Sequence, residues 1–261
     1  MKTAIISDIH GNAAALRAVL ADIDGRGDVD RIVCLGDIIG YGPEPLACVD
    51  LVSERCEWSL MGNHDFGVLY EPTNFNAAAE SAAYWTRLQF ESTEDVEERQ
   101  RRYRFLGRLR VRVVESKGIA GERPLLAVHG SPRRPINEYI FPDDAVGDQM
   151  KMRALFEEID SVAVCGHTHV PGVFTDEPEF YPPDELGSEM RYTFSAEEKA
   201  IINVGSVGQP RDFDPRASYA IMDDEGISFA RVEYDVDATA SRIRAIPELT
   251  DWLADRLLEG R

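Results

Sequence analysis

The stretch Thr3-Ala4-Ile5-Ile6-Ser7-Asp8-Ile9-His10 shows the pattern on which the fold depends: a short, mainly apolar run followed at once by an aspartate and a histidine. The run is apolar on both alternating faces, as expected for a strand that is covered on both sides. Five further runs have the same form and lead into glycine or a small polar residue; they are Ile32–Leu35, Trp58–Met61, Leu125–Val128, Val162–Cys165 and Ile201–Val204. The sequence therefore predicts an α/β fold whose strands lead into polar loops.

Helical patterns lie between these runs, so that strand, loop and helix alternate over the first two-thirds of the chain. Asn12 is placed to cap a helix, and Gly25 is its expected end. A second helix is expected over Ala145–Ile159; its inward-facing residues would be Val146, Met150 and Leu155. In sheets built this way, ligands bind at the carboxyl ends of the strands.

The pattern of the last third of the chain predicts a meander of strands followed by a helix. The strands are expected over Arg191–Phe194, Lys199–Val204, Ser218–Met222 and Ile227–Tyr234. The helix is expected over Ala238–Leu258, with a break at Pro247 because proline cannot continue a helix.

Residues 72–115 interrupt the alternation with two predicted helices, over Asn76–Phe90 and Thr93–Leu109. We interpret them as a helical insertion, and a candidate cap, within one domain that spans residues 1–261. The segment Arg99–Arg112 contains seven arginines. Three of these can pair with acidic residues one helical turn away: Asp95–Arg99, Glu97–Arg101 and Glu98–Arg102. This favours a solvated helix with ion pairs over an anion-binding face.

Charge and composition limit the possible partners and compartment. The net charge of −19 disfavours nucleic-acid duplexes and anionic membranes, which would be repelled. No apolar run approaches the roughly 20 residues of a membrane span. Met1 leads directly into the first strand without a signal peptide, and the four cysteines form no CxxC pair, so we expect a cytoplasmic protein. Cys34 and Cys165 each lie in an apolar run, where we expect a buried thiol. The oligomeric state is left open.

The histidines point to metal chemistry because each of the five follows a predicted strand: His10, His64, His129, His167 and His169. In an extended chain, residues i and i+2 share a face, so Asp8 with His10, and His167 with His169, can each grip one cation. Asp37, Asn63 and His129 add single ligands from other strand ends, with His64 left over. Seven ligands exceed the needs of one tetrahedral ion and suit two ions that share a carboxylate. A structural metal site or a buried polar network is the competing interpretation.

Five motifs occur in the order that is typical of the calcineurin-like metallophosphoesterase superfamily. They are Asp8-Ile9-His10, Gly36-Asp37, Gly62-Asn63-His64-Asp65, Val128-His129-Gly130 and Gly166-His167-Thr168-His169. The match covers about residues 1–210. More narrowly, the chain resembles small prokaryotic members that carry Gly-Asp-Ile-Ile-Gly-Tyr-Gly-Pro, here residues 36–43, and Asn-Val-Gly-Ser-Val-Gly-Gln-Pro-Arg, here residues 203–211.

The resemblance implies a four-layer αββα sandwich with two metal ions at one edge. By motif position, the first ion would be bound by Asp8, His10, Asp37 and His169. The second would be bound by Asp37, Asn63, His129 and His167, with Asp37 bridging the two. His64 would be a non-ligand histidine near the leaving group, and Asp65 would hold its ring. The mixed nitrogen and oxygen ligands suit Mn, Fe, Zn, Ni or Co ions, with Mn²⁺ the choice for loading in vitro.

The resemblance also implies a reaction: attack of a metal-bridging hydroxide on a phosphoester, with His64 as an imidazolium at the departing oxygen. We expect phosphodiesters or small phosphate esters as substrates, with Arg211 contacting phosphate and Tyr41 lining the site. The phosphate-gripping arginine of phosphoprotein phosphatases is missing from Ile38–Gly42, which weighs against a protein phosphatase. Two further possibilities are a dinucleoside polyphosphate hydrolase that uses the helices of Thr73–Arg112, and a non-catalytic scaffold.

Overall fold

The computed structural model describes residues 1–116, 123–177, 179–195 and 198–261, and within them two six-stranded sheets. The strands of the first sheet, in spatial order, are β3 (Trp58–Ser59), β2 (Arg31–Cys34), β1 (Thr3–Ile6), β11 (Ala217–Met222), β12 (Gly226–Val232) and β9 (Arg191–Thr193). Those of the second are β4 (Arg112–Glu115), β5 (Leu125–Val128), β6 (Val162–Cys165), β10 (Ala200–Asn203), β7 (Gly172–Thr175) and β8 (Phe180–Tyr181). A short 3-10 helix, η1, covers Pro183–Glu185.

All six predicted runs are strands, and they are the parallel ones. β1, β2 and β3 run parallel in the first sheet, while β5, β6 and β10 run parallel in the second. The predicted meander is correct for β9, β11 and β12, which pair antiparallel. It is wrong for β10, which joins the second sheet because its apolar residues pair with β6 and β7.

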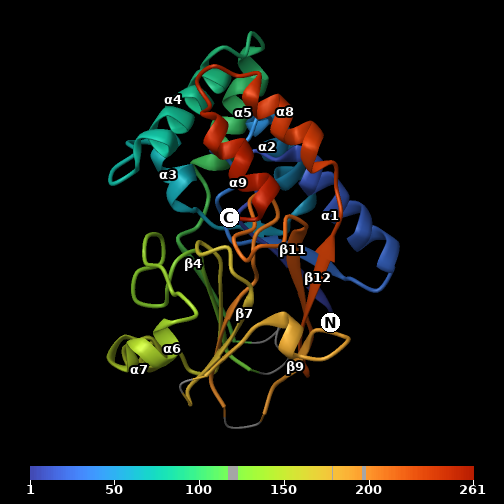
Figure 1. Cartoon of the computed structure of the whole chain (residues 1–261), viewed down its shortest axis with the longest axis vertical. Helices are drawn as coiled ribbons and strands as arrows, with labels where there is room; N and C mark the ends of the chain where they lie inside the picture. Colours follow the sequence, from blue (N-terminus) through green and yellow to red (C-terminus); the bar gives the residue numbers. More distant parts are fainter. Residues whose placement is uncertain (117–122, 178, 196–197) are drawn as a thin grey trace.

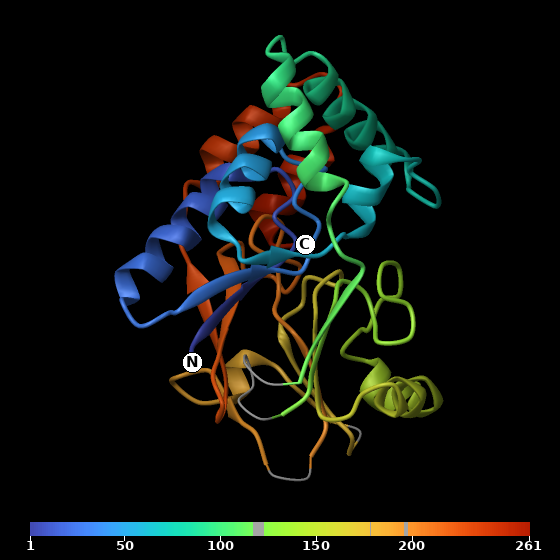
Figure 2. The same ribbon diagram turned by 180° about the vertical axis from the view of Figure 1, so that it is seen from behind.

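The two sheets pack face to face, with helices on their outer faces. Along β1, Ile5 packs between the sheets, whereas its neighbours Ala4 and Ile6 pack outward against the first helix, as the two-residue period of a strand requires. The outer helices are α1 (Ala13–Arg26) and α2 (Pro45–Arg55) on the first sheet, and α6 (Asp144–Gly147) and α7 (Gln149–Glu157) on the second. The predicted four-layer αββα sandwich is confirmed (Figures 1 and 2).

The first helix begins as expected but ends later. The side chain of Asn12 accepts a hydrogen bond from the backbone N–H of Ala15 at 3.1 Å. Gly25 does not end the helix, because α1 continues to Arg26 and Gly27 takes the left-handed conformation of a C-cap, with φ +70°.

The predicted helix over Ala145–Ile159 is two helices. They are separated by Asp148, whose backbone is not helical and whose side chain accepts from the N–H of Lys151 at 3.0 Å. The break turns Val146 and Met150 outward, with exposed fractions of 77% and 87%, so their predicted inward orientation is wrong. Leu155 is fully buried as expected.

The insertion contains α4 (Ala77–Glu91) and α5 (Val96–Leu106), and it packs against the rest of the domain. Figure 1 shows both helices at the end of the molecule that also carries the C-terminal helices α8 (Val236–Arg244) and α9 (Asp251–Glu259), which are separated as predicted around Pro247. Ala82 and Trp85 of α4 share an apolar cluster with Leu253 of α9.

Two arginines of α5 bind a neighbouring helix. Arg101 and Arg102 both donate to the carboxylate of Asp50 on α2, at 2.7 Å and 2.6 Å. Of the three ion pairs expected along α5, the described residues form Glu98–Arg102, at 3.4 Å. These arginines therefore hold the insertion against the first sheet's helical layer.

The four cysteines form no disulfide. Cys34 and Cys165 are buried as predicted, and Cys48 is buried as well. Among the helices that the structure describes, none has both the length and the apolar character needed to cross a bilayer.

Two glycines at the end of α1 make a matched test of this helix boundary. Gly25 is helical and a methyl group there would meet nothing within 4 Å, so Gly25→Ala should raise the free energy of unfolding by about 0.5–1 kcal/mol. Gly27→Ala should lower it by about 1 kcal/mol, because an L side chain is strained at positive φ. Urea unfolding of both variants measures this difference. Equal effects of the two substitutions would contradict the boundary at Gly27.

Candidate metal centre

The loops that follow the parallel strands bring all seven predicted ligands together. Each ligand lies on the loop after one strand or at the start of the next helix, as in α3 (Asn63–Leu69), which follows β3. The ligands are Asp8 and His10 after β1, Asp37 after β2, Asn63 after β3, His129 after β5, and His167 and His169 after β6. The two sheets contribute to one site because their carboxyl edges lie side by side.

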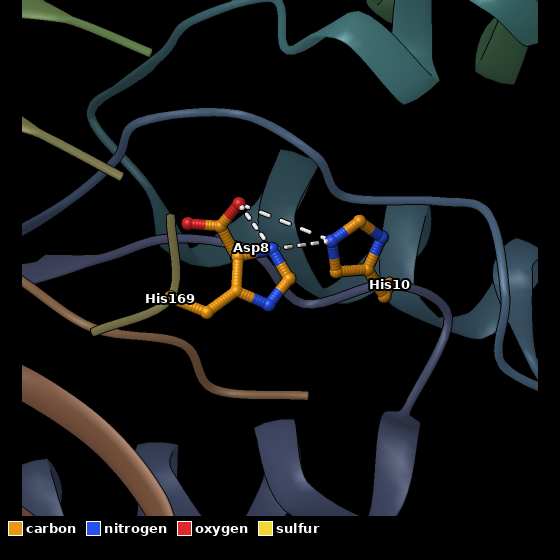
Figure 3. A group of neighbouring side chains, drawn as sticks. All are labelled: Asp8, His10 and His169. Atoms are coloured by element: carbon orange, nitrogen blue, oxygen red, sulfur yellow. Dashed lines mark hydrogen bonds and ion pairs between the residues drawn. The ribbon is translucent and has the colours of Figure 1, made fainter. Parts of the chain in front are cut away.

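The first group of side chains is Asp8, His10 and His169 (Figure 3). His169 Nε2 lies 3.1 Å from Asp8 Oδ1 and 3.1 Å from His10 Nε2. His10 Nε2 lies 3.9 Å from the same carboxylate oxygen. All three side chains are almost fully buried. Their donor atoms converge on one point, as the ligands of a single cation do.

The second group is Asp37, His129 and His167. His129 Nε2 lies 3.4 Å from Asp37 Oδ2, and this oxygen is also 3.6 Å from His10 Nε2 of the first group. Asp37 therefore faces both groups, in the position expected of a shared ligand. A third set combines His10 and Asp37 with His64.

His167 and His169 do not share one cation site, so the prediction from their spacing is wrong. The two rings belong to different groups, which agrees with the assignment implied by the family resemblance. Their backbones are left-handed, each with φ +65°, and so are those of Asp8 and His10, at +54° and +50°. None of these four residues is in an extended strand, so the two-residue spacing does not decide which group a side chain joins: Asp8 and His10 share the first group, whereas His167 and His169 are divided between the two.

The second ring nitrogen of two histidines is anchored to the backbone. His129 Nδ1 lies 3.0 Å from the carbonyl oxygen of Leu35, and His169 Nδ1 lies 2.5 Å from that of Gln209. A carbonyl can only accept, so Nδ1 carries a hydrogen and Nε2 faces the centre. This arrangement is typical of histidines that bind metals. Although burial opposes protonation of the His129 ring, Asp37 raises its pKa to about 9, so Nε2 of this ring must lose its proton to bind a metal.

Both aspartates of the centre are ionised. Burial opposes ionisation of Asp37, but the ring of His129 holds its pKa well below the usual value. Burial likewise opposes ionisation of Asp8, and His169 and His129 lower its pKa. Backbone amides also support the charges: the N–H of His64 donates to Asp37 at 2.8 Å, and that of His167 donates to Asp8 at 3.0 Å.

The chemistry of the donor set fits metal ions. Within the described residues, Asn63 Oδ1, His129 Nε2 and His167 Nε2 are buried and have no hydrogen-bond partner. An unsatisfied buried polar group costs roughly 1–3 kcal/mol. A cation at each group would satisfy these atoms together with the two carboxylates, so the residues present fit a metal centre.

Two glycines let the backbone approach the carboxylates. A methyl group on Gly62 would overlap Asp37 Oδ1, and one on Gly166 would overlap Asp8 Oδ2. Neither glycine was predicted to have this role, although each directly precedes a predicted ligand.

His64 is close to the centre, but Asp65 does not hold its ring. Asp65 Oδ1 accepts from the N–H groups of Ile38 and Ile39 at 3.0 Å and 3.3 Å, and Oδ2 accepts from Gly62 at 3.0 Å. Its carboxylate is therefore a structural clamp between two loops. Burial lowers the pKa of His64 to about 4, so the ring is neutral at pH 7 and the expected imidazolium is not its resting form.

A cavity of about 210 Å³ opens beside the centre. Three parts of the chain form its wall. The centre contributes Asn63, His64 and His167, with Tyr41 beside them, and the loop after β5 contributes Asn137 and Tyr139. The insertion contributes the residues from its first turn to the start of α4 that line the cavity, namely Thr73, Asn74, Phe75, Asn76 and Ala79. The insertion therefore forms one side of the site.

Tyr139, which was not predicted from the sequence, stacks on His167 with ring centres 3.8 Å apart. No local pattern marked it.

Tyr41 and Arg211 both lie at the centre. The Tyr41 ring is 4.8 Å from that of His10 and 4.3 Å from that of His64. The backbone N–H of Arg211 donates to the carbonyl of His169 at 3.3 Å, and its guanidinium donates to Gln209 Oε1 at 3.1 Å.

Comparisons with known proteins agree with this site. The profile of the calcineurin-like phosphoesterase superfamily domain matches residues 1–226. Protein MJ0912 of Methanocaldococcus jannaschii is 38% identical over 263 residues, which cover 99% of this chain and 98% of that protein.

Two solved structures are similar over the whole chain. A metallophosphoesterase from Sphaerobacter thermophilus superposes with a TM-score of 0.79 at 37% identity, covering 100% of this chain and 99% of the other. Hypothetical protein PH1004 from Pyrococcus horikoshii has a TM-score of 0.76 at 19% identity, covering 100% and 98%, and shows the same fold. With its sequence profile, its fold and its ligand motifs in agreement, the chain belongs to the calcineurin-like phosphoesterase superfamily.

Proposed function

We propose that the protein is a dinuclear metal-dependent phosphoesterase that hydrolyses phosphodiesters or small phosphate esters. The observation that carries this proposal is the position of Asp37. One carboxylate oxygen lies 3.6 Å from His10 Nε2 and 3.4 Å from His129 Nε2, between two groups of buried ligands. A buried carboxylate shared by two sets of imidazoles suits two neighbouring ions. The metallophosphoesterase relative supports the same interpretation.

The ligands divide as the family motifs imply. Asp8, His10, Asp37 and His169 would hold the first ion, and Asp37, Asn63, His129 and His167 the second. Two ions, when bound, polarise the phosphoryl oxygens and lower the pKa of water, which makes a nucleophile available at neutral pH. The nitrogen and oxygen donors suit Mn, Fe, Zn, Ni or Co.

Two side chains of the protein, His64 and Arg211, are placed to act on the departing oxygen and on the phosphoryl group. His64 lines the cavity and lies against the rings of Tyr41 and Phe75, 4.3 Å and 4.6 Å away between centres. These rings exclude water from one side of the imidazole. A neutral imidazole placed there can donate its N–H to the oxygen that departs from phosphorus, and Arg211 can donate to a phosphoryl oxygen.

The dinucleoside polyphosphate hydrolase and the non-catalytic scaffold receive less support. The first of these needs arginines of the insertion at the site. Among the described residues, Arg101 and Arg102 instead bind Asp50, and Arg87 donates to the backbone carbonyl of Val68. A scaffold that has lost catalysis would not need seven converging ligands.

The direct test combines metal content with turnover. After loading with Mn²⁺, elemental analysis should find two ions per chain. The loaded protein should then hydrolyse p-nitrophenyl phosphate, bis(p-nitrophenyl) phosphate or both. Absence of bound metal after loading would refute the proposal, and two ions without turnover of either ester would favour the scaffold.

Replacing the shared carboxylate should remove the paired site. Asp37→Asn removes the charge that both groups face, so at most one ion per chain should remain and turnover should fall by at least about a hundredfold. Asp28→Asn, at an exposed ion pair with Lys2, is the control and should keep both ions. Two ions still bound to Asp37→Asn would disprove the bridge.

His64→Ala separates a leaving-group role from a ligand role. If His64 acts on the departing oxygen, the variant should keep its metal content while turnover falls by roughly 10²–10⁴-fold. Phe66→Ala, on the same helix and partly exposed, serves as the control for helix α3. Loss of an ion from His64→Ala would show that the ring is a metal ligand, in the set with Asp37 and His10. Unchanged turnover would show that His64 has no role in the reaction.

A further inference from the structure

The described residues that line the cavity of about 210 Å³ beside the metal centre include no aspartate, glutamate, lysine or arginine. These four residue types make up 29% of the chain, so the composition of the protein does not explain why this wall lacks them. Aromatic rings, carboxamides, a threonine hydroxyl and imidazoles form the wall instead. Because burying an unpaired charge is costly, the part of a ligand that enters this cavity should be uncharged.

The cavity lies on the side of the centre where the leaving group of an ester would be. His64, which the proposed function places at the departing oxygen, lines the cavity together with the candidate ligands Asn63 and His167. Arg211, the candidate partner of the phosphoryl group, is not among the described residues of the wall. A phosphoryl group held at the centre would therefore direct its alcohol portion into the cavity.

Aromatic rings from three distant parts of the chain line this cavity. Tyr41 follows β2, Phe75 belongs to the insertion, and Tyr139 lies on the loop after β5. Tyr41 and Phe75 both pack on the His64 ring, with ring centres 4.3 Å and 4.6 Å away. Tyr139 stacks on His167. Rings fixed in this way present apolar surface, which favours a planar apolar group in the ligand.

Asn76 supplies hydrogen-bond donors beside these rings. Its Oδ1 accepts from the backbone N–H of Ala79 at 2.9 Å and thereby caps helix α4. This bond fixes the orientation of the carboxamide and leaves its NH2 group to donate elsewhere. Asn137, on the loop that carries Tyr139, adds a second carboxamide to the wall. Carboxamides pair with the edges of nucleobases, which carry both donors and acceptors.

We infer that this cavity binds the nucleoside portion of a nucleotide ester, so that the protein acts preferentially on phosphoesters whose leaving group is an uncharged nucleoside. A nucleoside combines a planar ring, which packs on aromatic side chains, with ring-edge groups that match carboxamides. Glycerol phosphate and sugar phosphates lack the planar ring. A polyphosphate brings negative charge that this wall does not balance. This inference rests on the proposed function and names its substrate class.

The size of the cavity favours one nucleoside over two. Its volume of about 210 Å³ is below the roughly 300–1,000 Å³ of pockets that hold drug-sized ligands. A mononucleotide ester therefore suits the site better than a dinucleotide.

The binding test uses the full-length, Zn²⁺-loaded protein and adenosine, which has no phosphate to be hydrolysed. Zn²⁺ is diamagnetic, so saturation-transfer NMR can measure the dissociation constants of adenosine and of ribose. Adenosine should bind at least about tenfold more tightly than ribose, because only adenosine has a base that packs on the rings. Asn76→Ser should weaken adenosine binding about 3- to 10-fold through loss of a hydrogen bond, while the serine hydroxyl still caps α4.

The kinetic test uses the Mn²⁺-loaded protein and two monoesters of primary alcohols, adenosine 5′-phosphate and glycerol 1-phosphate. Their departing oxygens are chemically similar, so the ratio of their kcat/KM values reports recognition of the alcohol portion. The ratio should favour the nucleotide by at least about tenfold, and Asn76→Ser should lower it about 3- to 10-fold.

Controls separate recognition of the nucleoside from support of helix α4. Asp95→Ser changes the N-cap of α5, which is in the same insertion and is not part of the described wall, and it should leave adenosine affinity and the substrate ratio unchanged. Should Asn76→Ser fail to fold, Asn137→Ala on the exposed loop tests the same kind of contact. A lower melting temperature of Asn76→Ser with unchanged adenosine affinity would overturn the inference, because it would show that Asn76 only caps the helix.

The outcomes also distinguish this inference from the proposed function. If the wild type hydrolyses both monoesters equally well, the phosphoesterase proposal survives and nucleoside selection is refuted. If it binds adenosine in an Asn76-dependent way but hydrolyses no phosphoester, the assignment of the cavity is supported and the catalytic proposal fails. If ribose binds as tightly as adenosine, or if neither binds, the nucleoside assignment is refuted.

Discussion

The structure depends on two ionised carboxylates, Asp8 and Asp37, that are almost completely buried near one another. An unpaired buried charge costs several kcal/mol, so each carboxylate needs positive charge and N–H donors around it. Backbone amides and imidazoles supply these contacts, and they come from the ends of strands in both sheets. The face-to-face packing of the sheets is therefore what makes the centre possible, since the first sheet alone would bring four of the seven ligands and the second sheet three.

This convergence is accompanied by backbone strain. Five of the candidate ligands have left-handed backbones, a conformation that costs an L residue roughly 1–2 kcal/mol each; they are Asp8, His10, Asp37, His167 and His169. Such conformations persist where surrounding contacts impose them, and they gather at functional sites. Here the contacts include the close approach of Gly62 and Gly166 to the two carboxylates. The concentration of strain in one cluster of loops supports a chemical role for it.

Helices from distant parts of the chain complete the site. The insertion helix α4 and the C-terminal helix α9 share an apolar cluster with Tyr41, which itself lies against His10 and His64. This packing brings one wall of the cavity to the metal centre. The arginines that look most like an anion site in the sequence, those of α5, instead hold the insertion to α2 through Asp50.

Local sequence patterns were enough to predict the parallel strands and the polar side chains that cluster at their ends, and the family resemblance implied the four layers. Apolar runs are local features, and the carboxyl ends of parallel strands meet at one edge, so residues after those runs come together. The family resemblance implied which group His167 and His169 each join, whereas their spacing alone gave the wrong answer. Other features became visible only in the folded chain: Asp65 holds backbone amides rather than His64, and Tyr139 stacks on His167. Those outcomes depend on single backbone angles and on the packing of segments that are far apart in the sequence, and a local sequence pattern determines neither.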